Sequence, residues 1–206
     1  MSPERNIFGY AAAFLLISAF CFWGLSCGDP HYSPKPRTYP RIDFPERKYE
    51  AYSRLSCPFS FQKPVYAEVL LDSTYFDEKA PSDCWFNLNF QGLNANLYCS
   101  YQALATKSDL EKYINESFRL VREHHIKADY IDELPYSRDN RVFGVMFNLE
   151  GPSASSFQFY LTDSSRHFLR GSLYFNTQVR PDSLAPFKEI LKYDILEIVN
   201  SLEWKD

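Results

Sequence analysis

Two short stretches of the chain hold residue types that could do chemistry. The segment GPSASS at residues 151–156 supplies serines, and Asp163 and His167 follow it, so the residue types of a serine-hydrolase triad are present. The segment lacks the G-x-S-x-G pattern that presents a nucleophilic serine on a sharp turn. Serine-rich segments also form ordinary turns. A hydrolase is therefore the less favoured interpretation.

A second candidate cluster lies in REHHIKADYIDE, where acidic and imidazole groups of the kind that ligate metals gather: Glu123, His124, His125, Asp129, Asp132 and Glu133. Adjacent residues on a helix point about 100° apart, so His124 and His125 do not easily share one ion. The favoured interpretation is a helix end whose cationic groups interact with the helix dipole, with His125 partly buried. The sequence contains no CxxC motif and no phosphate-binding glycine loop, so we predict no metal and no cofactor.

Hydrophobic periodicity indicates the elements that must position these groups. Alternating or continuous apolar residues predict strands at CPFSFQ, VYAEVLLD, WFNLNF, ANLYCSYQA, RVFGVMFNLE, SSFQFYLTD and HFLRGSLYFN. Amphipathic helices are predicted over residues 106–125, with a Ser108–Glu111 capping box, and over residues 186–204. Runs of strands separated by helices predict an α+β fold, with a mainly antiparallel sheet flanked by the two helices. A PsbP/Mog1-like sandwich is one such architecture, offered as an analogy.

The first thirty residues predict export and a lipid anchor. Residues 7–25 carry no charge, and the run ends in GLSC. This pattern resembles a bacterial lipobox, so we predict a lipoprotein signal peptide over residues 1–26 and acylation of Cys27. Gly24 stands where the lipobox usually has a large aliphatic residue. An uncleaved anchor helix and a buried helix are the alternatives.

The segment after Cys27 is rich in proline, which disfavours regular structure, so residues 27–48 are predicted to form an extended tether. Tyr39, Ile42 and Phe44 are the tether residues that could dock on the domain. Residues 49–206 are predicted to form a single globular domain.

Three cysteines follow the tether. An exported domain meets an oxidising compartment, and Cys57 and Cys84 both stand where predicted strands begin, so we predict that they form a disulfide. Cys99 falls on the apolar face of its strand and is predicted to be a buried thiol.

The net charge and the aromatic content limit the kinds of partner that the protein can bind. The net charge is −4 and no basic stripe occurs, which argues against a nucleic-acid surface. Aromatic residues make up 17% of the chain, and those outside the core could form a protein-binding patch. The predicted partner surface lies within residues 158–174 and comprises Gln158, Tyr160, Thr162, Asp163, His167 and Tyr174. Ordinary hairpin packing is the alternative interpretation there.

The order of motifs resembles the GldD family of gliding motility lipoproteins of Bacteroidetes-type bacteria. The motifs that carry the resemblance are SCG, YPRIDFPERKY, CPFSF, CWFNLNF, HHIKADYIDELPY, ASSFQFYLTDSSRHFLRGSLYFN, PDSLAP and the terminal LEW. The resemblance implies a membrane-anchored periplasmic component of the gliding machinery, which is tied to type IX protein secretion. It implies no enzymatic activity, and Cys27 is the only functional residue that it transfers.

We therefore expect a lipoprotein that is anchored through Cys27 and binds other cell-envelope proteins as a scaffold, without catalysis. Tyrosines and asparagines on an exposed, flat sheet face would favour that function. The alternative is a periplasmic lipoprotein that binds a small ligand, which requires a pocket of a few hundred Å³ with converging polar groups.

Overall fold

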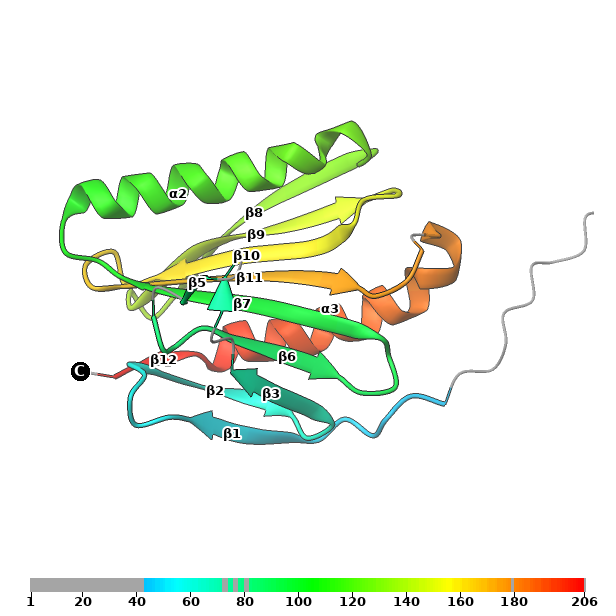
Figure 1. Ribbon diagram of the computed structural model, residues 1–206, viewed down its shortest axis with the longest axis horizontal. Helices are drawn as coiled ribbons and strands as arrows, with labels where there is room; N and C mark the ends of the chain where they lie inside the picture. The colour runs from blue at the N-terminus through cyan, green and yellow to red at the C-terminus, as the bar shows by residue number, and fades with distance from the viewer. Residues whose placement is uncertain (1–42, 72–73, 76–77, 80–81, 179, 206) are drawn as a thin grey trace, which may run out of the picture. The chain divides into compact units, whose positions relative to one another are not determined.

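The computed structural model describes residues 43–71, 74–75, 78–79, 82–178 and 180–205. The predicted signal peptide, the lipidation site Cys27 and residues 28–42 of the tether lie outside the described residues. In the described part, the polypeptide forms two antiparallel sheets and two long helices (Figure 1).

The larger sheet has seven strands, each antiparallel to its neighbours. Their spatial order is β3 (Ala67–Leu71), β6 (Phe86–Phe90), β7 (Ala95–Ala103), β11 (His167–Phe175), β10 (Ser155–Thr162), β9 (Val142–Glu150) and β8 (Tyr130–Arg138). The smaller sheet contains β1 (Tyr49–Ser53), β2 (Phe59–Pro64) and β12 (Glu203–Trp204). Two two-residue strands, β4 (Thr74–Tyr75) and β5 (Glu78–Lys79), pair with each other.

The helices lie on opposite faces of the larger sheet (Figure 1). Helix α2 (Lys107–Arg122), which continues into the 3₁₀ turn η2 (Glu123–Ile126), packs on strands β8 to β11, where Phe118 meets Phe147 edge-on. Helix α3 (Pro181–Ser201) fills the opposite side together with the smaller sheet, and its Leu191, Ile195 and Ile198 are fully buried there. This arrangement confirms the predicted α+β class, with a mainly antiparallel sheet and two flanking amphipathic helices.

Five strands were not predicted from the sequence: β1, β4, β5, β8 and β12. Strand β8 includes the LPYS segment, whose Pro135 is a residue type that disfavours regular strand pairing. The strand is at the edge of the sheet, where the missing proline N–H needs no partner. The terminal LEW, predicted as helix, is also different: Leu202 adopts an extended conformation and Glu203–Trp204 pairs with β2.

The boundaries of α2 also correct the sequence prediction. The capping box is formed by Thr106 and Asp109 rather than by Ser108 and Glu111, since Thr106 has the extended backbone that an N-cap requires. At the other end, His125 is exposed and His124 is half-buried, the reverse of the expectation for His125. The tighter 3₁₀ turn advances about 120° per residue rather than 100°, which changes the phase of the two histidines.

The folded part of the chain reaches into the predicted tether. Phe44 packs edge-on against Phe187 of α3, with 5.7 Å between ring centroids. Tyr49 donates a hydrogen bond of 2.8 Å to the buried carboxylate of Asp194 on α3, and Tyr66 donates to the same carboxylate. Burial and the bond to Asp194 raise the pKa of Tyr49 to about 12, so this phenol stays a donor at any ordinary pH.

The cysteines are arranged as the sequence predicts. Cys57 and Cys84 form a disulfide, with 5.6 Å between their Cα atoms, and the bond joins the segments that lead into β2 and β6. Cys99 is a buried free thiol, and burial raises its pKa well above the ordinary value. A thiol that stays protonated is a weak nucleophile, so Cys99 is a packing residue.

Candidate functional site

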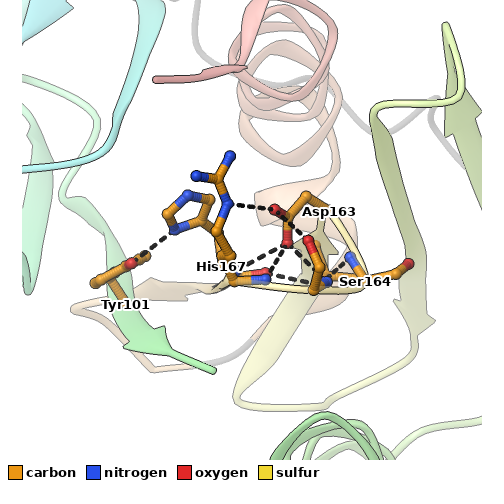
Figure 2. Close-up of polar contacts among 7 residues, drawn as sticks. Tyr101, Asp163, Ser164 and His167 are labelled. Atoms are coloured by element: carbon orange, nitrogen blue, oxygen red, sulfur yellow. Dashed lines mark hydrogen bonds and ion pairs between the residues drawn. The ribbon is translucent and has the colours of Figure 1, made fainter. Parts of the chain in front are cut away.

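Asp163 organises the turn between β10 and β11 (Figure 2). Its Oδ1 accepts the backbone N–H groups of Ser165, Arg166 and His167 at 3.0, 2.8 and 2.8 Å, and its Oδ2 accepts the Ser165 hydroxyl at 3.0 Å. Burial opposes ionisation, but these donors outweigh it and lower the pKa of Asp163 below its usual range. The carboxylate is thus committed to holding a turn in which Ser164 has a φ of 65°.

His167 points to the opposite side from α2, into the core. Its Nδ1 lies 2.8 Å from the Tyr101 hydroxyl (Figure 2). Its ring stacks on Trp204, with 5.2 Å between ring centroids. Ser155 begins the eight-residue strand β10 and Asp163 follows the end of that strand, so about 25 Å of extended chain separates them. The serine, histidine and aspartate do not meet, and the triad considered from the sequence is wrong.

Burial also corrects the predicted partner surface. Gln158, Tyr160, Thr162 and His167 are all buried, because β10 and β11 are central strands covered on one face by α2 and on the other by the core. Asp163 is engaged in its turn. Tyr174 is the one member of the predicted set that reaches an accessible cavity.

The acidic and imidazole cluster does not assemble into a ligand set. Within the described residues, no three His, Cys, Asp or Glu side chains are placed to hold a metal ion. His124 instead lies against Tyr174, with 6.2 Å between ring centroids, while His125 faces solvent.

A pocket that the sequence did not reveal lies where α2 leaves the larger sheet. It has a volume of about 390 Å³ and lies between α2 and the α2-facing side of β6, β7 and β11. Tyr113, Glu116 and Ser117 line it from the helix. The strands contribute polar residues from alternate positions: Asn87, Tyr98, Ser100, Gln102, Arg170, Ser172 and Tyr174. These positions share one face because Tyr98 is paired with both Asn87 and Ser172.

Arg170 brings a positive charge to this pocket. Its Nη2 donates to Oε1 of Gln158 at 2.7 Å, and the Ser172 hydroxyl lies 3.3 Å from the same oxygen. Gln158 is 1% exposed, and its Nε2 has no hydrogen-bond partner in the described part of the chain. Desolvation, reinforced by Arg170, lowers the pKa of His124 and keeps that ring neutral near pH 7.

Tyrosine rings shape the open side of the pocket. Tyr98 is 43% exposed and meets Tyr174 edge-on, with 5.7 Å between ring centroids. A signal for this arrangement was present in β7, whose Leu97, Cys99 and Tyr101 alternate with polar residues. Such alternation is normally taken to mean that the polar side faces solvent, so it did not indicate a cavity.

Beyond the pocket, the same side of the sheet continues without cover from α2 (Figure 1). We call this area the uncovered face and define it by Glu68, Leu70, Asn89, Asn96 and Tyr98 on strands β3, β6 and β7. Glu68, Leu70 and Tyr98 are exposed, and the Asn89 side-chain amide donates to that of Asn96 at 2.8 Å. The face thus combines an exposed tyrosine with two half-buried asparagines, the residue types expected of a scaffold surface.

Comparison with known protein families shows to which family the chain belongs. The family described as gliding motility lipoprotein GldD matches residues 29–204. The chain belongs to the GldD family. Membership in this family shows that the protein is a gliding motility lipoprotein of the bacterial envelope and is anchored to a membrane. No helix in the described residues is both long and apolar enough to cross a bilayer.

Other comparisons add little to the GldD assignment. No curated protein matches the chain. Among solved structures, cyanobacterial PsbP (CyanoP) from Synechocystis sp. PCC 6803 is similar over 84% of this chain and 99% of its own, with a TM-score of 0.47 and 9% identity. PsbP is one of the architectures named from the sequence. A likeness of this degree carries no inference about partners or ligands.

The half-buried His124 and the buried His167 of this GldD-family chain predict acid sensitivity. Desolvation is the main cause that lowers the pKa of both His124 and His167. Unfolding returns each imidazole to an ordinary pKa of about 6.5, so below that pH the unfolded state binds more protons. The free energy of unfolding is therefore expected to fall as pH drops from about 6.5 to 5, by at most about 1.4 kcal/mol per pH unit for each histidine.

Urea unfolding at a series of pH values measures this slope. His167→Gln is expected to reduce it, whereas His125→Gln, at an exposed position, is the matched control and should leave it unchanged. The carboxylates with lowered pKa, Glu150 and Asp163, change charge mainly below about pH 4.5 and do not contribute in this window. If the free energy of unfolding depends on pH with the same slope in the wild type and in His167→Gln, His167 is not a cause of the acid sensitivity.

Proposed function

We propose that this GldD-family protein is anchored by an acylated Cys27, faces the periplasm, and acts without catalysis as a binding or scaffold component of the gliding motility and type IX secretion machinery. Family membership supports the envelope setting. Acyl chains contribute about 0.8 kcal/mol per buried CH₂, and two or more chains give stable attachment. The folded domain is thereby confined near a membrane, where its partners are other envelope proteins.

The observation that carries the proposal is the uncovered face. This face carries one charged residue, Glu68, and otherwise presents asparagines, Tyr98 and Leu70. Tyrosine is enriched in interface cores because it buries a large rigid ring and still offers a hydroxyl for hydrogen bonding. Asn89 and Asn96 supply amide donors and acceptors beside it. The partner that fits is a protein surface with matching hydrogen-bonding groups.

Site-specific photo-crosslinking in cells tests this function. A photoreactive phenylalanine analogue placed at Leu70, which is 43% exposed on the uncovered face, is expected to capture a small number of discrete envelope proteins. The matched control is the same analogue at Tyr130, which is 61% exposed on the opposite edge strand β8. Crosslinks of equal yield and pattern at the two positions, or none at Leu70, would refute docking through the uncovered face.

The variant Cys27→Ala, which removes the predicted acylation site, tests the lipid anchor in the same crosslinking experiment. This variant is expected to leave the membrane fraction, and the crosslinks from position 70 should fall because the local concentration of partners is lost. Retention of Cys27→Ala in membranes with the N-terminal segment uncut would replace lipidation by an anchor helix.

A second candidate function is the binding of a small ligand by the pocket beside α2. The observation that favours it is the cavity itself, whose volume of about 390 Å³ and convergent polar side chains meet the requirement stated from the sequence. The two functions use neighbouring areas of one sheet face and are compatible in one molecule.

A further inference from the structure

We infer that the pocket beside α2 binds a neutral, hydroxyl-rich ligand, a short oligosaccharide. The inference rests on the second function proposed above, ligand binding by this pocket, and adds the chemical class of the ligand. Three features carry it: the balance of charge, the mixture of donors and acceptors, and the tyrosine rings.

The charged groups that line the pocket have opposite signs. Arg170 lies on β11 and Glu116 on α2, so the lining has no net charge. An anionic ligand would be attracted by Arg170 and repelled by Glu116. A cationic ligand would be attracted by Glu116 and repelled by Arg170. A neutral ligand with hydroxyl groups satisfies both, because a hydroxyl donates to the carboxylate and accepts from the guanidinium.

The neutral polar groups of the lining can both donate and accept hydrogen bonds. Ser100 and Ser172 carry hydroxyls, and Gln102 carries an amide with both a donor and an acceptor end. Such a set suits a ligand whose every polar group can donate and accept, which is the property of a sugar hydroxyl. An ionised carboxylate only accepts hydrogen bonds, and an ammonium group only donates them.

Aromatic rings provide the apolar part of the site. Tyr98, Tyr113 and Tyr174 line the pocket, and Tyr98 and Tyr174 stand edge to face at 5.7 Å. A pyranose ring has C–H groups on its faces, which pack against the electron-rich face of an aromatic ring. Tyrosines therefore hold the apolar face of a sugar while the polar side chains hold its hydroxyls.

The test uses the full chain in a detergent without a sugar head group, titrated separately with chitotriose, cellotriose, maltotriose and mannotriose by isothermal calorimetry. At least one of these neutral trisaccharides is expected to bind. Tyr98→Ala and Gln102→Ala are expected to weaken that binding about tenfold or more. Their matched controls are Tyr130→Ala and Gln91→Ala, at exposed positions outside the lining, which should leave the affinity unchanged.

Two further probes separate failure of this inference from failure of the pocket function. Trigalacturonate tests an anionic sugar, and the tripeptide Ala-Tyr-Ala tests a peptide. If either binds in a Tyr98-dependent manner while no neutral trisaccharide does, the ligand class is wrong and ligand binding stands. The inference is overturned if none of the six probes binds. It is also overturned if Tyr98→Ala and Gln102→Ala leave the affinity unchanged.

Discussion

Replacing Phe59 by alanine is expected to lower the free energy of unfolding by about 3–5 kcal/mol. Phe59 is 1% exposed and lies where the smaller sheet meets the larger one. Its ring contacts Phe86 at 5.8 Å and Tyr101 at 5.6 Å, both on the larger sheet. It also meets Trp204 of β12 edge-on at 6.4 Å. Removal of the ring would leave a cavity among three elements that cannot close around it without moving the sheets.

Urea unfolding of the purified protein measures the change as a shift in midpoint at constant slope. Leu55→Ala is the matched control, because Leu55 is fully exposed and its loss should change stability by less than about 0.5 kcal/mol. Phe59→Leu, which keeps most of the volume, should cost clearly less than Phe59→Ala. A loss of under about 1 kcal/mol in Phe59→Ala would show that the two sheets do not depend on this contact.

Removing the disulfide with the double variant Cys57→Ala/Cys84→Ala is expected to lower the free energy of unfolding by about 3 kcal/mol. The bond closes a 27-residue separation, and cross-linking restricts the unfolded chain over that interval. It also holds the start of β2 beside the start of β6. Lys205 adds to this junction, since its Nζ donates to the carbonyls of Arg54 and Cys57 at 3.0 and 3.1 Å.

A reductant distinguishes the loss of the bond from the loss of side-chain packing. Dithiothreitol should destabilise the wild type and Cys99→Ala by a similar amount and leave the double variant unaffected. A reductant that has no effect on the wild type would mean that the two thiols are not joined in the native protein.

Local sequence pattern predicted much of the larger sheet. Residues 95–103 alternate without a break and form β7 over that same range. Strand β8 was missed because Pro135 is a strand breaker in general, but is tolerated in an edge strand. Strand β12 was missed because two residues carry no periodicity, and only pairing with β2 makes them a strand.

The candidate site was less predictable than the fold. The sequence analysis placed Gln158, Tyr160 and Thr162 in a partner surface, because the sequence could not show that α2 packs against β10 and buries them. The same helix stops short of Tyr98 and Arg170, which leaves the pocket and the uncovered face. The decisive contacts, such as Phe118 with Phe147, join residues far apart in the chain.

By itself, the sequence determined the α+β class, the disulfide pair, the buried thiol and the resemblance to the GldD family. The tertiary structure alone decided which half of the larger sheet is covered, where the pocket lies, and that Asp163 and His167 have structural roles. The physical reason is that periodicity states to which side of a strand each side chain points. What lies on that side depends on the packing of helices whose contacts are distant in sequence.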